Sequence, residues 1–278
     1  MNRLLGWIAT LALIAAGAAS AEAGDTLNRV MQNKKLVNAV DAEYPPFSFL
    51  NADNVMDGFD VDVAKEVAKR MGVDIEFVTP GWDVITSGKW AGRWDICIGS
   101  MTATKERGEV LDFPAQYYFA NAVILVHKDS PITDPADLAG KRIGAQVATT
   151  YEKYLQHNLE IDAAGAPAVV YKIDSPQVVS YDEEPLGVED LSLGDGKRLD
   201  AMLVGQLTAE DYIKNGKPLK IVGGTLFAEP IAVAIDKGDP ELAAKIVEII
   251  DAMRADGTLK KLSMDRLGID ITTPPSGS

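Results

Sequence analysis

Apolar positions along this chain follow two alternating spacings, one typical of strands and one typical of helices. Residues 36–40 are mostly apolar and predict a buried strand. From Asp60 onward, Val63, Val67 and Met71 recur at four-residue spacing, which predicts a helix capped by Asp60. We therefore expect the folded part of the chain to open with a strand followed by a helix.

The most regular helical pattern lies near the C-terminal end. Leu242, Ile246, Ile249 and Met253 form one apolar stripe that follows Asp239, a residue type that caps helices. Further strands are predicted at residues 73–77, 95–98, 122–126, 142–145, 169–171, 201–204, 221–222 and 231–235, with a short helix near Thr104. Strands that alternate with helices predict an α/β fold.

One segment departs from this alternation. Between residues 174 and 195, Pro176, Pro185, Gly187 and Gly194 interrupt every long apolar pattern. We expect this segment to be an irregular excursion on the surface.

The N-terminal residues have the pattern of a secretory signal. Arg3 precedes an apolar run over residues 4–19, and two A-x-A sequences follow, at 19–21 and 21–23. We expect residues 1–23 to be a signal peptide, with the mature chain starting at Glu22 or Gly24. No later segment has about 18 consecutive apolar residues, so a soluble, periplasmic protein is expected.

Charge and composition exclude several classes of function. The formal net charge is −14, which disfavours a nucleic-acid partner. The one cysteine, Cys97, excludes an intramolecular disulfide, and together with two histidines it supplies too few ligands for a typical zinc site. We expect no metal and no cofactor.

The segment from Gly99 to Arg107 has the composition of an anion site. Gly99 permits close approach, Ser100 and Thr102 offer hydroxyls, and Arg107 offers a guanidinium fork for a carboxylate. Taken alone, this pattern is a weak signal, and base rates favour a strand-to-helix turn with a surface arginine.

Three other positions follow predicted strands and have a structural alternative. Tyr44 and Trp82 are suited to wall a pocket, or to fill the core. Thr149 and Thr150 precede a helical pattern and are typical of an N-cap. Trp90 and Trp94 are assigned to core packing.

Eight sequence segments occur in the order found in one family. They are YPPFSF (44–49), GFDVDVA (58–64), WDVI (82–85), DICIGSMTATKER (95–107), DFPAQYY (112–118), DLAGK (137–141), KRLDA (197–201) and DG (256–257). With these segments the chain resembles the polar amino-acid-binding proteins of ABC importers, bacterial extracellular solute-binding protein family 3. Each segment is common, but the ordered set is specific.

The resemblance implies the type II periplasmic binding protein fold. Two α/β lobes, each with a mainly parallel sheet flanked by helices, would be joined by two hinge crossovers near Val126 and Phe227. Lobe 1 would comprise residues 24–126 plus 228–278, and lobe 2 residues 127–227. A ligand would be enclosed between the lobes by hinge bending.

The same resemblance implies roles for the candidate residues. Arg107 would clasp the ligand's carboxylate, helped by Ser100 and Thr102, with Gly99 at the approach. Tyr44 and Trp82 would flank the ligand's side chain, and Asp41 or Glu43 would contact its polar end. From lobe 2, Thr149 and Thr150 would add contacts to the carboxylate.

Position 205 departs from the family pattern. The family has an aspartate after the D-A-x-x-x run, which pairs with the ligand's α-ammonium, but here residues 200–204 are followed by Gly205. A buried unpaired ammonium costs several kcal/mol, so either another acid replaces it or the ligand is not a simple α-amino acid. The candidate replacements are Glu183, Glu184, Glu229, Asp41 and Glu43.

The sequence therefore predicts a monomeric, non-enzymatic binding protein that delivers an amino acid or another small carboxylate to a membrane permease. Two alternatives remain. The first is an enzyme resembling cyclohexadienyl dehydratases, with Glu183 or Glu184 as general acid. The second is a sensor component that presents its ligand to a receptor.

Overall fold

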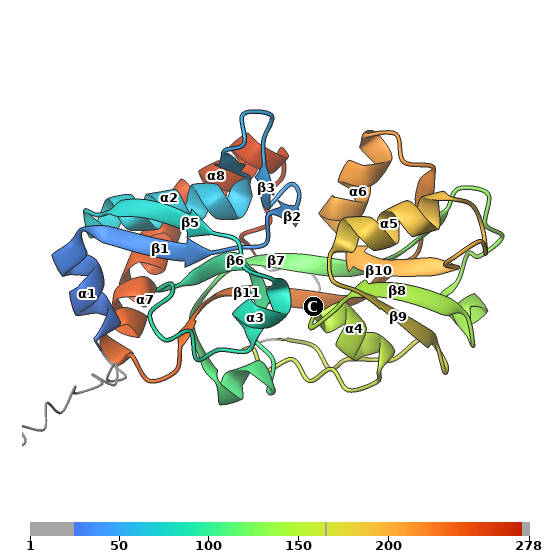
Figure 1. Cartoon of the computed structure of the whole chain (residues 1–278), viewed down its shortest axis with the longest axis horizontal. Coiled ribbons are helices and arrows are strands. Elements are labelled where there is room, and N and C mark those ends of the chain that lie inside the picture. The colour runs from blue at the N-terminus through green and yellow to red at the C-terminus, as the bar shows by residue number, and fades with distance from the viewer. Residues whose placement is uncertain (1–24, 165, 274–278) are drawn as a thin grey trace, which may run out of the picture.

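Two α/β lobes lie side by side in the computed structural model, which describes residues 25–164 and 166–273 (Figure 1). The predicted signal peptide, residues 1–23, lies outside the described residues. None of the described helices combines the length and apolar character that crossing a membrane requires.

Two long antiparallel strands, β7 (Leu111–His127) and β11 (Leu219–Asp236), run through both lobes. They lie within a six-stranded sheet with the order β6-β11-β7-β10-β8-β9 (Figure 1). The sequence predicted only pieces of them, at residues 122–126, 221–222 and 231–235. In β11, Gly223 and Gly224 adopt positive φ, and the strand continues past them with a shift in its register to β7.

Lobe 1 contains three strands that the apolar runs predicted. Its β1 (Lys35–Ala39) pairs in parallel with β5 (Asp74–Val78), and β6 (Cys97–Thr102) pairs antiparallel with β11. The remaining elements of this lobe are α1 (Thr26–Asn33), β2 (Glu43–Tyr44), β3 (Ser48–Leu50), β4 (Met56–Asp57), α2 (Phe59–Met71), α3 (Trp82–Thr86), η1 (Arg107–Glu109), α7 (Pro240–Ala255) and α8 (Thr258–Leu267). A short 3-10 turn, η1, thus stands where a helix near Thr104 was predicted.

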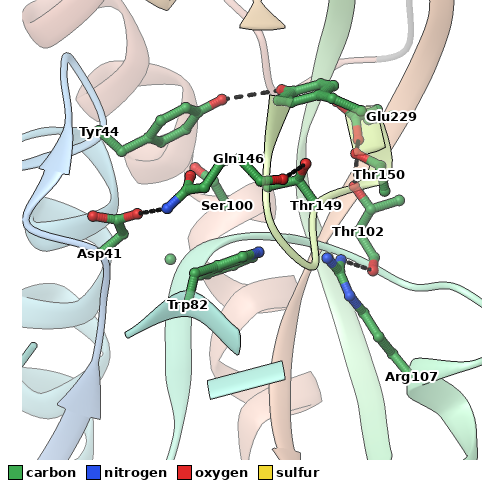
Figure 2. A pocket seen from close by; sticks show the side chains of 12 residues that line it. Asp41, Tyr44, Trp82, Ser100, Thr102, Arg107, Gln146, Thr149, Thr150 and Glu229 are labelled. Carbon is green, nitrogen blue, oxygen red and sulfur yellow. Dashed lines mark hydrogen bonds between the residues drawn. The ribbon is translucent and has the colours of Figure 1, made fainter. Parts of the chain in front are cut away.

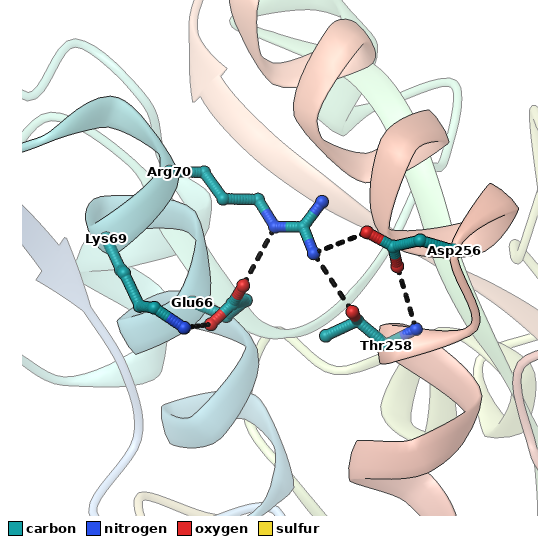
Figure 3. A network of polar contacts seen from close by, with 5 residues as sticks. All are labelled: Glu66, Lys69, Arg70, Asp256 and Thr258. Atoms are coloured by element: carbon teal, nitrogen blue, oxygen red, sulfur yellow. Dashed lines mark hydrogen bonds and ion pairs between the residues drawn. The ribbon is translucent and has the colours of Figure 1, made fainter.

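A polar network fastens the C-terminal helices to α2 (Figure 3). Arg70 on α2 donates to Glu66 at 2.8 Å, to Asp256 at 2.8 Å and to the Thr258 hydroxyl at 2.9 Å. Asp256 also accepts the backbone N–H of Thr258 at 2.9 Å, which orients the start of α8. One guanidinium thereby joins segments almost two hundred positions apart in the sequence.

Lobe 2 contains three parallel strands, β10 (Ala201–Gly205), β8 (Arg142–Gln146) and β9 (Gln177–Tyr181). Its helices are η2 (Pro135–Leu138), α4 (Thr150–Leu155), α5 (Glu184–Ser192) and α6 (Gln206–Lys214). The strand predicted at residues 169–171 is not present.

The prediction of an irregular excursion at residues 174–195 was wrong, because β9 and α5 lie there. Pro185 stands in the first turn of α5, where its missing N–H breaks no helical hydrogen bond. A Cβ at Gly187 would lie 2.6 Å from the terminal methyl of Met202, so glycine lets α5 pack closely on β10. Both interrupting residues therefore serve the helix that they were expected to prevent.

The side-chain clusters show where β7 and β11 pass from one lobe to the other. On β7, Ala120 packs with lobe 1 and Ala122 with lobe 2. On β11, Phe227 packs with lobe 2 and Ile231 with lobe 1. The division into residues 24–126 plus 228–278 and 127–227 stays a proposal, and the packing of Val126 within lobe 2 favours an earlier boundary on β7.

The predicted stripe of α7 can be tested by paired substitutions. Ile246 is fully buried in the lobe 1 cluster, whereas its neighbour Val247 is 36% exposed. We expect Ile246→Ala to lower the free energy of unfolding by about 2–5 kcal/mol, because it leaves a cavity. Val247→Ala should change it by less than about 0.5 kcal/mol. Urea denaturation measures both, and equal losses would contradict the assigned stripe.

Candidate functional site

A pocket with about 400 Å³ of empty space, open solvent included, lies between the lobes, where β7 and β11 pass from one lobe to the other (Figure 2). Its lining residues come from both lobes and from β11: Asp41, Tyr44, Trp82, Gly99, Ser100, Thr102, Arg107, Gln146, Thr149, Thr150, Tyr151 and Glu229. The structure therefore brings together all the predicted site residues except Glu43 and Gly205.

Arg107 places a buried positive charge at one end of the pocket. Its guanidinium donates to the carbonyl of Thr102 at 2.9 Å and to the carbonyl of Ala148, in lobe 2, at 2.8 Å. The Arg107 Cζ lies 5.6 Å from the Trp82 ring centroid. Burial lowers the pKa of Arg107 to about 10, so the group stays charged at neutral pH.

This charge has no acidic partner. Among the described residues no carboxylate forms a salt bridge with Arg107, and both side-chain hydrogen bonds go to neutral carbonyls. The Trp82 indole N–H, also buried, finds no acceptor within the described ranges. Unpaired buried donors are costly, so the pocket is suited to an anion.

Glu229 on β11 places a carboxylate in the same pocket. It is 2% exposed and pairs in register with Ala120 of β7, at the crossing between the lobes. Its Oε1 accepts from the Thr102 hydroxyl at 2.9 Å and from the Thr150 hydroxyl at 2.5 Å. Burial raises its pKa, and these hydroxyls and Arg107 oppose that increase.

The two threonines from lobe 2 have different roles. Thr149 caps α4, because its hydroxyl accepts the backbone N–H of Glu152 at 3.2 Å and donates to the carbonyl of Gln146 at 2.6 Å. The predicted N-cap is thus present, and the same residue lines the pocket. Thr150 directs its hydroxyl to Glu229 instead.

The Ser100 side chain is held by lobe 1. Its hydroxyl donates to Asp60 at 2.6 Å and accepts from Tyr118 at 2.6 Å, while Tyr117 donates to Asp60 at 2.7 Å. Asp60 was predicted as the cap of α2, but Gly58 is the N-cap and Asp60 supports the pocket wall. Burial raises the pKa of Asp60 to about 6, against the effect of the Ser100 and Tyr117 hydrogen bonds.

Two side-chain pairs cross the mouth of the pocket (Figure 2). The hydroxyls of Tyr44 and Tyr151 lie 3.2 Å apart, and Gln146 donates to Asp41 at 2.9 Å. Each pair joins lobe 1 to lobe 2. Glu43 lies outside the lining and is exposed, and partial burial together with Glu183 and Asp41 raises its pKa.

Gly205 ends β10 behind the two tyrosines. A Cβ at this position would lie 2.6 Å from the Tyr44 hydroxyl oxygen and 3.2 Å from that of Tyr151. The space that an aspartate side chain would enter is therefore filled by tyrosine hydroxyls. A side chain at position 205 would require these hydroxyls to shift.

Sequence reasoning missed two lining residues, Gln146 and Tyr151, and named Glu229 only as one of five possible acids. Gln146 is the last residue of β8, and Tyr151 directly follows Thr149 and Thr150. Their positions, at the carboxyl end of a strand and at the start of a helix, could have identified them, because small ligands bind at such positions in α/β sheets.

Comparison with known proteins agrees with this architecture. Residues 36–268 match the family model described as bacterial extracellular solute-binding proteins, family 3. The L-cystine-binding protein TcyJ of Escherichia coli K12 is 32% identical over 249 residues, covering 88% of this chain and 87% of the relative. The L-arginine-binding protein of Pseudomonas aeruginosa is 32% identical over 241 residues, covering 84% of this chain and 87% of the relative.

Among solved structures, the ancestral amino acid-binding protein AncCDT-1, a precursor of cyclohexadienyl dehydratase, has a TM-score of 0.74 and 32% identity. The match covers 86% of this chain and 98% of that one. Fold, family match and relatives agree with the resemblance seen in the sequence. The chain belongs to family 3 of the bacterial extracellular solute-binding proteins.

Proposed function

We propose that this chain is the periplasmic binding component of an ABC importer and captures an amino acid between its lobes. The observation that carries the proposal is the buried guanidinium of Arg107, which faces the pocket without an acidic partner in the described residues. A ligand carboxylate supplies the missing negative charge. The names of the cystine- and arginine-binding relatives support an amino acid as the ligand class.

The two acids named for the enzyme alternative do not lie in the pocket. Neither Glu183 nor Glu184 belongs to its lining. A binding role, in which a monomer delivers the ligand to a membrane permease and requires neither cofactor nor nucleic acid, therefore remains the proposal.

Contacts between the lobes support capture by closure. Besides the Tyr44–Tyr151 and Asp41–Gln146 pairs, Thr104 of lobe 1 forms an antiparallel bridge with Ile161 of lobe 2. These contacts cover the pocket while β7 and β11 remain continuous beneath it. Bending of the two strands would separate the lobes and open the pocket.

Closure also buries an acid outside the pocket. Glu184, in the first turn of α5, is 2% exposed, and its Oε1 has no hydrogen-bond partner in the described parts of the chain. Burial and the neighbouring charge of Asp41 raise the pKa of Glu184 to about 8, opposed by the Tyr212 hydroxyl. Since α5 contacts β2 of lobe 1, we propose that closure contributes to this burial.

Replacing Arg107 tests the central claim. With an amino acid present at 100 times its dissociation constant, binding should stabilise the wild type by about 2.7 kcal/mol, and Arg107→Ala should abolish this gain. The control is Arg198→Ala, which removes an exposed guanidinium that pairs with Asp190 at 2.9 Å. Thermal shifts with L-arginine, L-cystine, L-histidine and L-glutamine measure the effect. An unchanged shift in Arg107→Ala would refute the carboxylate contact.

The buried acid predicts a pH dependence. The pKa of Glu184 is about 8 in the fold against an ordinary value of 4.5, so the native state holds a proton that the unfolded state releases. Stability from this group is present below pH 4.5 and is lost as pH rises towards 8.

We therefore expect the melting temperature of the wild type to fall between pH 5 and pH 8 relative to that of Glu184→Gln, by roughly 5 °C. Differential scanning calorimetry at intervals across this range measures the difference. If the melting temperatures of the two proteins change in parallel with pH, Glu184 has an ordinary pKa and the prediction is wrong.

A further inference from the structure

Position 205, where the family pattern has the acid that pairs with the ammonium, is a glycine in this chain. The hydroxyls of Tyr44 and Tyr151 fill the space next to Gly205, and Thr208 Oγ1 would lie 3.7 Å from a Cβ placed there. Restoring an acid would require the two tyrosines to move. The proposed amino-acid ligand therefore needs a negative partner from another element.

The pocket lining reduces the five candidate acids to two. Glu43, Glu183 and Glu184 lie outside the lining, whereas Asp41 and Glu229 belong to it. Asp41 stands at the mouth, where it accepts from Gln146 Nε2 at 2.9 Å and from the backbone N–H of Glu43 at 2.9 Å. Glu229 lies at the end of the pocket that contains Arg107, the predicted carboxylate anchor (Figure 2).

Thr102 sets the spacing between Glu229 and Arg107. Its carbonyl accepts from Arg107 at 2.9 Å and its hydroxyl donates to Glu229 at 2.9 Å. In the described chain the two charged groups form no salt bridge with each other, although each influences the pKa of the other. The pocket therefore presents a cation and an anion that are close together and held apart by one residue.

This arrangement is complementary to a zwitterion. An α-amino acid carries its carboxylate and its ammonium on one carbon, so the two groups can bind neighbouring opposite charges. Resting on the proposed function, in which Arg107 binds the carboxylate, we propose that Glu229 binds the ligand's α-ammonium in place of an acid at position 205. Asp41 remains available to the distal end of the ligand.

Glu229 differs from an acid at position 205 in where it lies, because position 205 belongs to lobe 2 alone. Glu229 belongs to a strand that traverses both lobes, and its carboxylate is fixed by Thr102 from lobe 1 and Thr150 from lobe 2. The Thr150 bond thus joins lobe 2 to this strand. We expect an ammonium held by Glu229 to bind at this junction between the lobes.

Glu229→Gln tests the proposal because the amide keeps an acceptor for both threonines and loses only the charge. The probes are L-arginine, L-histidine and L-glutamine, each paired with its des-amino carboxylic acid, measured by isothermal titration calorimetry. The wild type should prefer an amino acid to its des-amino partner by about 100-fold. In Glu229→Gln this preference should fall at least tenfold, while affinity for the des-amino acid stays within about threefold.

Asp41→Asn is the matched control, because it removes one negative charge from the same pocket and should keep the preference for the ammonium group. Circular dichroism and melting curves without ligand establish that both variants fold. If Glu229→Gln keeps the wild-type preference, or weakens both partners of a pair equally, the assignment of Glu229 is overturned and the proposed function stands. If the wild type binds none of the amino acids, both fail.

Discussion

The continuous ladder between β7 and β11 is the constraint on which the rest of the structure depends. Because both strands belong to both lobes, neither lobe can be assembled without the other's backbone. The apolar cluster that contains Ala120 and the one that contains Ala122 lie on either side of the position where Ala120 pairs with Glu229, and Glu229 lines the pocket. The pocket therefore lies where the core of one lobe ends and the core of the other begins.

Two opposite charges, Arg107 and Glu229, are buried at this boundary between the cores, and their burial affects the free energy of the pocket. A guanidinium and a carboxylate that are both nearly buried destabilise the empty, closed pocket, because each has lost water and neither has the other as a direct partner. The zwitterionic ligand that we propose would offset that penalty. The same groups would then favour the open form without ligand and the closed form with it, which is the behaviour that capture and release require.

Sequence patterns predicted at least part of most of the longer strands in this chain, but only the two helices with the clearest apolar stripes. The apolar stripes of α2 and α7 are buried as the sequence predicted, because the side of an amphipathic helix that packs on the core carries apolar residues at three- and four-residue spacing. The full lengths of β7 and β11 were not predicted, because only their most apolar stretches were recognised as strands. The role proposed for Arg107 came only from the family resemblance. The absence of an acid at position 205 was visible in the sequence, but the hydroxyls beside Gly205 were not, because Tyr44 and Tyr151 meet only in the folded chain.

Trp82 gives the protein an optical property that follows from its place in the pocket wall. Of the four tryptophans, Trp7 falls in the predicted signal peptide, and Trp90 and Trp94 pack in the core. Among the described residues, Trp82 alone combines a pocket position with an adjacent guanidinium. Ligand arrival therefore alters the surroundings of one indole while two others stay constant, so intrinsic fluorescence reports occupancy without any attached label.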